Sequence, residues 1–177
     1  MHGVEFMRPM RVLSPLLVAA SFFLLPLACV CASAQTLAPG PSAIQHVTLA
    51  PSAVPPVATT GGQVTLLLDV TPKRDIHVYA PGAKDFIQTT LTLSPQGRLS
   101  IGKPGYPRAE LVLDPVLNER IPEYTKTFRI AQPVTLGPAV KSPEVLTISG
   151  VLSYQACDDK MCYPPASALV TWTVKVK

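Results

Sequence analysis

Proline is spread along almost the whole chain, and this restricts what the sequence can fold into. Twenty of the 177 residues are proline, and between Pro39 and Pro165 the longest stretch without one covers residues 144–163. A proline inside a helix costs roughly 3 kcal/mol, because it removes a hydrogen bond and clashes with the preceding turn. A helical bundle is therefore excluded. Because 47% of the residues are hydrophobic and only 15% are charged, the composition still favours a packed core over disorder.

The charge pattern and the motifs exclude several classes of protein. The formal net charge of +4 is modest, and the Lys and Arg residues are scattered along the chain. No nucleic-acid partner is therefore expected. Neither a glycine-rich phosphate loop nor the Cys/His spacing of a zinc site occurs in the sequence. We accordingly predict no small-molecule cofactor and no metal; copper held by Met161, His77 and two cysteines is the weaker alternative.

Residues 1–34 have the organisation of a signal peptide. Two arginines precede an almost wholly apolar run over residues 13–30, and Ala32-Ser33-Ala34 supplies the small residues that signal peptidase accepts. We predict cleavage before Gln35 and export to the periplasm. No second apolar run of about 18 residues follows, so no further membrane span is expected.

Two alternatives remain for this N-terminal segment, namely an uncleaved membrane anchor and lipidation at Cys29. Cleavage would remove Cys29 and Cys31 together. Cys157 and Cys162 would then be the cysteines that reach an oxidising compartment. This pair, five positions apart, is the most reactive chemistry that the exported chain would carry.

Alternation of apolar and polar residues predicts a series of short strands separated by turn signals. The predicted strands cover residues 46–49, 64–70, 76–79, 90–93, 111–113, 126–131, 146–154 and 168–176. Such a series is typical of an immunoglobulin-like β-sandwich, and we predict this all-β fold for residues 61–177. Residues 35–60, rich in Ala, Pro, Ser and Thr, are predicted as a Pro/Ala-rich N-terminal segment. A lipocalin-type barrel is less favoured, because proline interrupts a continuous ladder.

The cysteine pair has two interpretations. In an exported protein such a pair is usually a structural disulfide, which would make the chain a non-catalytic immunoglobulin-like binding module. However, closing a loop of about six residues stabilises a fold by only roughly 2 kcal/mol, against nearly 5 for a loop of a hundred residues. Short, exposed disulfides exchange readily. Asp158 and Asp159 lie between the cysteines and disfavour a thiolate, which argues against a strongly activated nucleophile.

The residues around the pair resemble a known family. Residues 154–165, with the sequence YQACDDKMCYPP, are similar to the active-site hairpin of the N-terminal periplasmic domain of DsbD, the thiol:disulfide interchange protein. The shared pattern is Y-Q-x-C, a short insert and C-Y-P-P. Ile76-His77-Val78-Tyr79 resembles the aromatic strand beside the cysteines in that family, with Tyr79 at a family tyrosine and His77 where Tyr can stand. The resemblance covers roughly residues 61–177.

The resemblance implies a function as a protein-disulfide reductase, or thiol–disulfide oxidoreductase. In that family the domain is reduced by a membrane-embedded electron carrier, here expected to be a DsbD-like or CcdA-like protein acting in trans. The domain then reduces periplasmic thioredoxin-like proteins, such as disulfide isomerases and the reductants of cytochrome c maturation. By position, Cys162 would form the mixed disulfide and Cys157 would resolve it.

The resemblance also implies the surroundings of the pair. We expect a supporting set around the two cysteines, made up of His77, Tyr79, Tyr154, Asp158, Asp159 and Tyr163. The family covers its cysteines with a loop that has an aromatic tip. The equivalent loop should lie within residues 113–121, where no aromatic residue occurs and Val116 or Leu117 would take its place.

Overall fold

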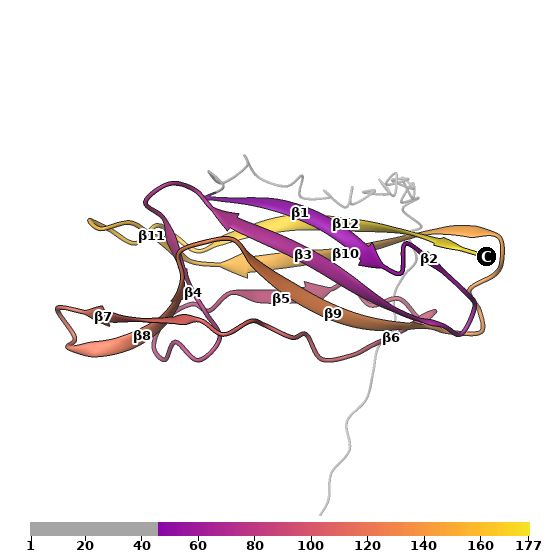
Figure 1. Cartoon of the computed structure of the whole chain (residues 1–177), viewed down its shortest axis with the longest axis horizontal. Helices are drawn as coiled ribbons and strands as arrows, with labels where there is room; N and C mark the ends of the chain where they lie inside the picture. Colours follow the sequence, from indigo (N-terminus) through magenta and orange to yellow (C-terminus); the bar gives the residue numbers. More distant parts are fainter. Residues whose placement is uncertain (1–45) are drawn as a thin grey trace, which may run out of the picture. The chain divides into compact units, whose positions relative to one another are not determined.

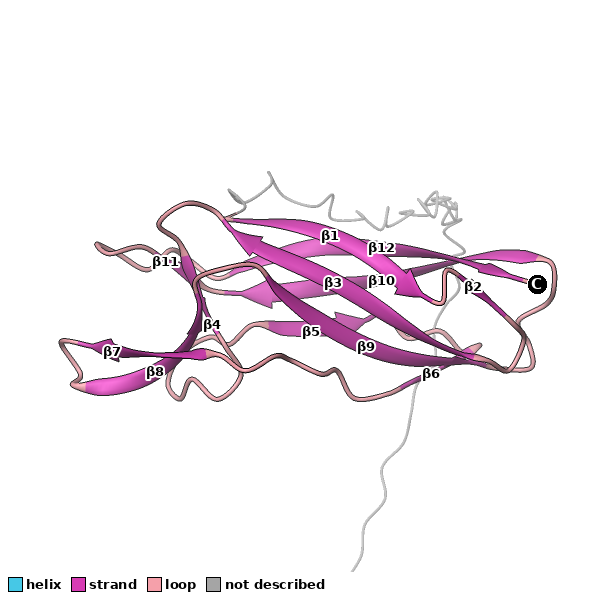
Figure 2. Cartoon of the chain, viewed as in Figure 1, coloured by secondary structure: helices cyan, strands magenta, loops and turns pink. Residues whose placement is uncertain are grey.

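The computed structural model describes residues 46–177, and the predicted signal peptide lies outside this range. The described residues form strands, turns and loops without any helix (Figure 2), and hence no helix there is long and apolar enough to cross a membrane. The strands are β1 (Val47–Val54), β2 (Val57–Ala58), β3 (Gln63–Pro72), β4 (His77–Tyr79), β5 (Thr90–Leu93), β6 (Leu99–Ile101), β7 (Glu110–Asp114), β8 (Glu119–Tyr124), β9 (Phe128–Leu136), β10 (Glu144–Tyr154), β11 (Ala156–Cys157) and β12 (Ala166–Val176).

The strands form three four-stranded sheets (Figure 1). The first sheet has the order β1-β3-β9-β6, the second β2-β12-β10-β5, and the third, called here the small sheet, β11-β4-β8-β7. Neighbouring strands are antiparallel except for β2 and β12, which are parallel. The fold is an all-β, immunoglobulin-like β-sandwich, and this prediction from the sequence is confirmed.

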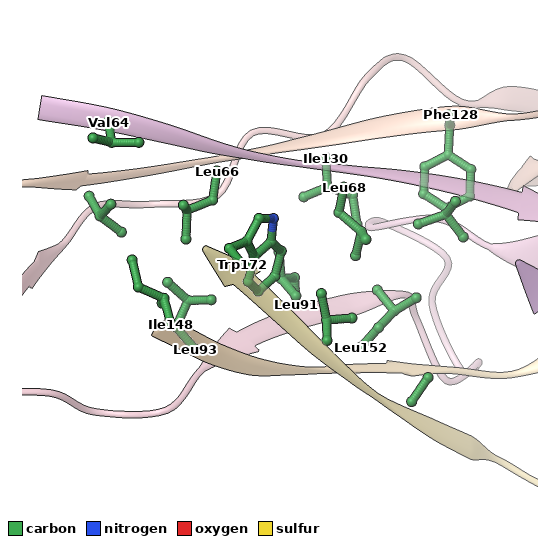
Figure 3. Close-up of a cluster of buried hydrophobic side chains, with 14 of the residues drawn as sticks. Val64, Leu66, Leu68, Leu91, Leu93, Phe128, Ile130, Ile148, Leu152 and Trp172 are labelled. Carbon is green, nitrogen blue, oxygen red and sulfur yellow. The ribbon is translucent and has the colours of Figure 1, made fainter. Parts of the chain in front are cut away.

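The main core lies between the first and second sheets (Figure 3). In β3 and β12 every second side chain is buried, as the two-residue period of a strand with one covered face requires. Trp172 of β12 is 2% exposed, and its indole N–H donates a 2.8 Å hydrogen bond to the Leu67 carbonyl of β3. The largest buried side chain therefore also links the two sheets through its one polar group.

Gly150 interrupts the apolar pattern of β10 for a packing reason. A Cβ atom at this position would lie 2.9 Å from a Leu93 methyl carbon and from the Thr92 carbonyl oxygen, and 3.3 Å from the Trp172 ring. These distances are shorter than ordinary van der Waals contacts. Glycine is therefore needed here because β5 and the Trp172 ring approach the β10 backbone closely.

Strand structure in the N-terminal part of the described residues is more extensive than the sequence patterns indicated. Part of the predicted Pro/Ala-rich segment forms β1 and β2, and β1 pairs with β3 from Val47, opposite Pro72, to Val54, opposite Thr65. The strand predicted over residues 46–49 is thus the start of a longer one. Pro51 is tolerated because β1 is the edge strand of the first sheet, where a missing N–H need not break a ladder.

Candidate functional site

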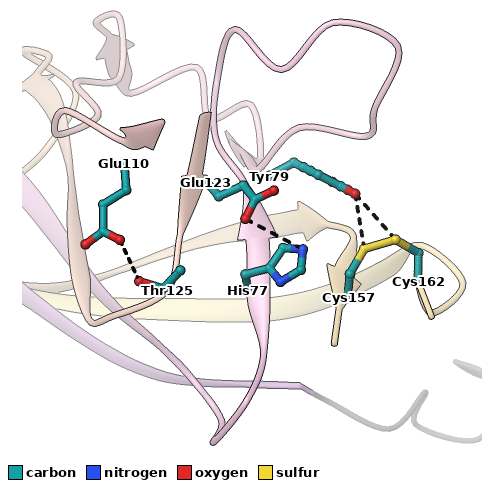
Figure 4. A network of polar contacts seen from close by, with 7 residues as sticks. All are labelled: His77, Tyr79, Glu110, Glu123, Thr125, Cys157 and Cys162. Carbon is teal, nitrogen blue, oxygen red and sulfur yellow. Dashed lines mark hydrogen bonds and ion pairs between the residues drawn. A yellow bond between two sulfur atoms is a disulfide. The ribbon is translucent and has the colours of Figure 1, made fainter. Parts of the chain in front are cut away.

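The register of the small sheet gathers four chemically active side chains on one face. Cys157 of β11 lies directly opposite His77 of β4, and Tyr79 of β4 lies directly opposite Glu123 of β8. His77 and Tyr79 are two residues apart and share a face, and directly opposed residues of an antiparallel pair also share one. Cys157, His77, Tyr79 and Glu123 therefore point to the same side of the sheet (Figure 4).

The opposite face of the small sheet belongs to the main core. Val78, Ala156 and Tyr124 alternate with the four active residues, are 0–5% exposed and pack in the large apolar cluster. Each short strand is therefore anchored by one face while it presents reactive groups on the other. Two-residue and three-residue strands have little stability of their own, so this packing is what fixes the site.

Cys157 and Cys162 form a disulfide, with their Cα atoms 4.0 Å apart. The two ends of the bridge differ in access. Cys157 is 1% exposed, whereas Cys162 is an exposed residue of the loop that follows β11. Cys162 is thus the end of the bridge that is open to solvent, and Cys157 is the buried end.

The turn between the cysteines is organised by Asp158. Its Oδ1 accepts hydrogen bonds from the backbone N–H groups of Lys160 and Met161, at 2.8 and 2.9 Å. Its Oδ2 accepts a 2.6 Å hydrogen bond from the Tyr163 hydroxyl. The Tyr163 hydrogen bond and these backbone N–H groups lower the pKa of Asp158 to about 2. Tyr163 in turn stacks on His46, with ring centroids 4.0 Å apart, so the predicted residues Asp158 and Tyr163 shape the hairpin.

The Tyr79 hydroxyl lies beside the disulfide. Its oxygen is 3.4 Å from the sulfur of Cys157 and 3.4 Å from that of Cys162 (Figure 4). Because a disulfide has no S–H group, the phenol is the donor in these contacts. Burial, and then the charges of Glu123 and Asp114, raise the pKa of Tyr79. The hydroxyl therefore stays protonated at neutral pH and can donate to a thiolate that forms when the bridge opens.

His77 and Glu123 form the second polar contact of the site. Nε2 of His77 lies 3.7 Å from Oε2 of Glu123, and their side chains are 22% and 9% exposed. Burial lowers the pKa of His77, although Asp159 and Asp158 raise it. Burial, followed by the charge of Asp114, raises the pKa of Glu123 to about 7. The charged forms of both groups are disfavoured mainly because water is excluded from them.

An aromatic side chain covers this cluster, but it comes from a different loop than expected. Phe86, between β4 and β5, stacks on Tyr79 with ring centroids 4.2 Å apart and packs against the small apolar cluster that contains Cys157. Val116 and Leu117 are 89% and 52% exposed. They lie at the turn between β7 and β8, a hairpin that contributes Ile121 to the cluster instead. The expectation that Val116 or Leu117 covers the pair is therefore wrong for this structure.

The remaining predicted residues lie around the site in different ways. Tyr154 is 1% exposed and belongs to the main core; its hydroxyl accepts a 3.2 Å hydrogen bond from the His46 backbone N–H. It fixes the start of β1 rather than contacting a sulfur. Asp159 is exposed and acts on the site through its charge, since it raises the pKa of His77.

Two residues of the site, Glu123 and Phe86, were not found from the sequence. Glu123 lies two positions after Ile121, so both side chains face the same cluster, and a carboxyl group on an apolar-facing position was a usable signal. Phe86 is an isolated aromatic residue in a loop between two strands, so neither a periodic pattern nor a motif in the sequence indicates that it packs beside the cysteines. Within residues 46–177, no three His, Cys, Asp or Glu side chains are grouped so as to hold a metal ion.

Comparison with known proteins places the chain in a family. The sequence model of "Thiol:disulfide interchange protein DsbD, N-terminal" matches residues 45–173, so the match begins before the region of resemblance seen in the sequence. A search of curated proteins gives no match.

Two solved structures of N-terminal domains are similar to the chain. The reduced N-terminal domain of DsbD from Neisseria meningitidis is 20% identical, with a TM-score of 0.44, covering 72% of this chain and 86% of that one. The N-terminal periplasmic domain of ScsB from Proteus mirabilis is 15% identical, with a TM-score of 0.44, covering 74% of this chain and 47% of that one. Because the family match spans well over half of the sequence and includes both cysteines, the chain belongs to the family of DsbD N-terminal domains.

Proposed function

We propose that the protein is a periplasmic thiol–disulfide exchange protein that relays electrons through Cys157 and Cys162. A membrane-embedded DsbD-like or CcdA-like carrier would reduce the pair in trans, and thioredoxin-like proteins, including those of cytochrome c maturation, would be the acceptors. The observation that carries the proposal is the unequal exposure of the two cysteines, with Cys157 1% exposed and Cys162 an exposed residue. A structural disulfide needs no such asymmetry, whereas exchange needs one sulfur that a partner can attack.

The geometry supports a two-step transfer. The Cys162 thiolate attacks one sulfur of the acceptor disulfide, so that a Cys162–acceptor bond forms and the other acceptor sulfur leaves as a thiolate. The Cys157 thiolate then attacks the sulfur of Cys162, which restores the Cys157–Cys162 bond and releases the second acceptor sulfur. Two electrons pass to the acceptor. The short loop holds Cys157 at high effective concentration for the second step, and the Tyr79 hydroxyl lies within reach of both sulfurs.

The reduction potential of the pair tests the proposal. The protein is equilibrated with glutathione or thioredoxin buffers, and the free thiols are trapped and counted. We expect a midpoint between about −180 and −270 mV, as in proteins that exchange thiols, with the reduced protein still folded. A midpoint well below about −300 mV together with unfolding on reduction would instead establish a structural disulfide in a binding module.

A second experiment tests the partners. With Cys157→Ser, the resolving thiol is missing, and a mixed disulfide between Cys162 and a thioredoxin-like acceptor is expected to accumulate. With Cys162→Ser, the remaining thiol is buried and no such adduct is expected. Equal trapping by both variants would contradict the assigned order of attack.

A further inference from the structure

Glu123 is a buried carboxyl group that the two-step transfer does not use. It lies in β8, between β4 and β7, and the whole residue is 6% exposed. Its carboxyl group faces His77 at 3.7 Å. A buried carboxyl group that is not paired with a Lys or Arg side chain destabilises a fold. The position of Glu123 near the two cysteines therefore calls for a functional explanation.

The order of the strands puts His77 between Glu123 and Cys157. β4 pairs with β11 on one side and with β8 on the other. His77 is directly opposite Cys157, a relation in which Cβ atoms lie about 4.5–5.5 Å apart. Figure 4 shows the imidazole ring between the Glu123 carboxyl group and the disulfide. The three side chains form a row that leads from the buried carboxyl group to the buried sulfur.

Burial, more than the neighbouring charges, shifts the pKa values of the two titratable groups in this row. Burial raises the pKa of Glu123 to about 7 and lowers the pKa of His77, so both shifts favour a proton on the carboxyl group over one on the imidazole. The neighbouring titratable and charged groups are Asp158 and Asp159 of the hairpin, Asp75 before β4, Tyr79 of β4, Glu110 and Asp114 of β7, and Lys126 after β8. Glu110 lies directly opposite Glu123, and Arg108 and Arg129 line a pocket with Glu123.

We propose that Glu123 is a positioning residue that, through His77, holds the proton exchanged with the Cys157 thiol. This inference rests on the proposed exchange function. When the mixed disulfide is resolved, the Cys157 S–H bond breaks and its proton passes to the His77–Glu123 pair. The thiolate electron pair forms the bond to the Cys162 sulfur, and the acceptor leaves as a thiolate that takes a proton from solvent.

The reverse reaction uses the same proton. When a donor thiolate attacks the sulfur of Cys162, the Cys157–Cys162 bond breaks and its electron pair stays on Cys157. The His77–Glu123 pair then returns a proton to this buried thiolate, whose charge the apolar surroundings disfavour. His77 also lines a surface pocket with Asp75, Lys126 and Asp159, through which the pair exchanges protons with water.

The test is the rate of the intramolecular step in Glu123→Gln, which keeps the size of the side chain but cannot hold the proton. The mixed disulfide between Cys162 and glutathione is formed from the reduced protein. Its conversion to the Cys157–Cys162 disulfide is followed by acid quenching between about pH 5.5 and pH 8.5, on both sides of the usual pKa of histidine. Glu119→Gln, an exposed position of the same strand, is the matched control.

We expect the Glu123→Gln rate to fall about tenfold near neutral pH, less than the usual contribution of general acid–base groups because a thiol also ionises unaided. The variant rate should rise steadily with pH as free thiolate forms, whereas the rates of the wild type and of Glu119→Gln should level off. In a Cys157→Ser background, Glu123→Gln should leave the attack of Cys162 on glutathione disulfide unchanged.

Identical rates and pH profiles for Glu123→Gln and the wild type would overturn the inference while leaving the exchange function intact. Failure of the wild type to form the Cys157–Cys162 disulfide from the mixed disulfide would overturn both. If Glu123→Gln does not fold, His77→Gln provides the second test, because it removes the ring between the carboxyl group and the sulfur. The same loss of rate is expected from it, and an unchanged rate would contradict the proposal.

Discussion

The main core and the outer face of the small sheet differ in the kind of side chain that they contain. Between the first and second sheets nearly all buried positions are apolar, with Gln132 of β9 as a polar exception, and residues such as Leu66, Ile148 and Val174 are fully buried. The outer face of the small sheet carries a carboxyl group, an imidazole, a phenol and a disulfide instead. The comparison teaches that stability and reactivity are assigned to different layers of one small domain.

The two regions meet in single strands. In β4 the side chain of Val78 enters the main core while those of His77 and Tyr79 line the reactive face, and in β11 Ala156 and Cys157 divide in the same way. The core therefore holds the reactive groups in place without sharing their chemistry. Opening the disulfide should consequently leave the sandwich folded.

The largest effect is expected from damage to the main core. Trp172→Ala removes the largest buried side chain and its hydrogen bond to β3, and should lower the free energy of unfolding by about 3–5 kcal/mol. Urea unfolding measures this loss. Leu169→Ala, on the outer face of the same strand and 77% exposed, is the control and should change stability by less than about 0.5 kcal/mol. Similar losses in both variants would remove the distinction between the two faces.

A smaller loss of stability is expected from damage to the reactive face. The double variant Cys157→Ser with Cys162→Ser removes a disulfide between residues only five positions apart. Because the loop that this disulfide closes is short, the free energy of unfolding should fall by no more than about 2 kcal/mol. Exchange with any disulfide should be abolished. The same urea titration and a thiol-exchange assay check the two parts. A loss as large as that of Trp172→Ala would show that the disulfide is structural.

The smallest effect concerns the turn between the cysteines and depends on pH. The pKa of Asp158 is about 2 in the folded protein, against an ordinary value of 3.8. Because the folded value is depressed, its contribution to stability is present above about pH 4 and is lost as the pH falls towards 2. Asp158→Asn should therefore be less stable than the wild type at neutral pH, and the difference should shrink in acid.

Urea midpoints at several pH values, with Asp159→Asn as the control for a neighbouring carboxyl group, measure this dependence. Asp159 is exposed and does not accept the hydrogen bonds that organise the turn. A difference between Asp158→Asn and the wild type that stays constant down to pH 2 would contradict the assigned role of the carboxylate.

Local pattern was sufficient for the long strands. The alternation that predicted strands over residues 146–154 and 168–176 corresponds to β10 and β12, with Leu152 and Trp172 buried as expected. Local pattern found only the start of β1 and missed β8, which contain Pro51 and Pro122. In a sequence, a proline indicates the end of a strand. In the folded protein, the hydrogen bonds that the strand makes with its neighbours decide whether a proline is tolerated.

The sequence by itself determined the all-β class, the faces of the long strands and the identity of the reactive pair, because these depend on residue periodicity, proline content and a short motif. Only the tertiary structure decided that Glu123 and Phe86 join the groups around the cysteines. Glu123 is 34 residues from Cys157 along the chain, and Phe86 belongs to another loop than the one expected to cover the pair. The physical reason is that β11, β4 and β8 become neighbours only through long-range pairing, which sets both the burial and the charge of each group beside the disulfide.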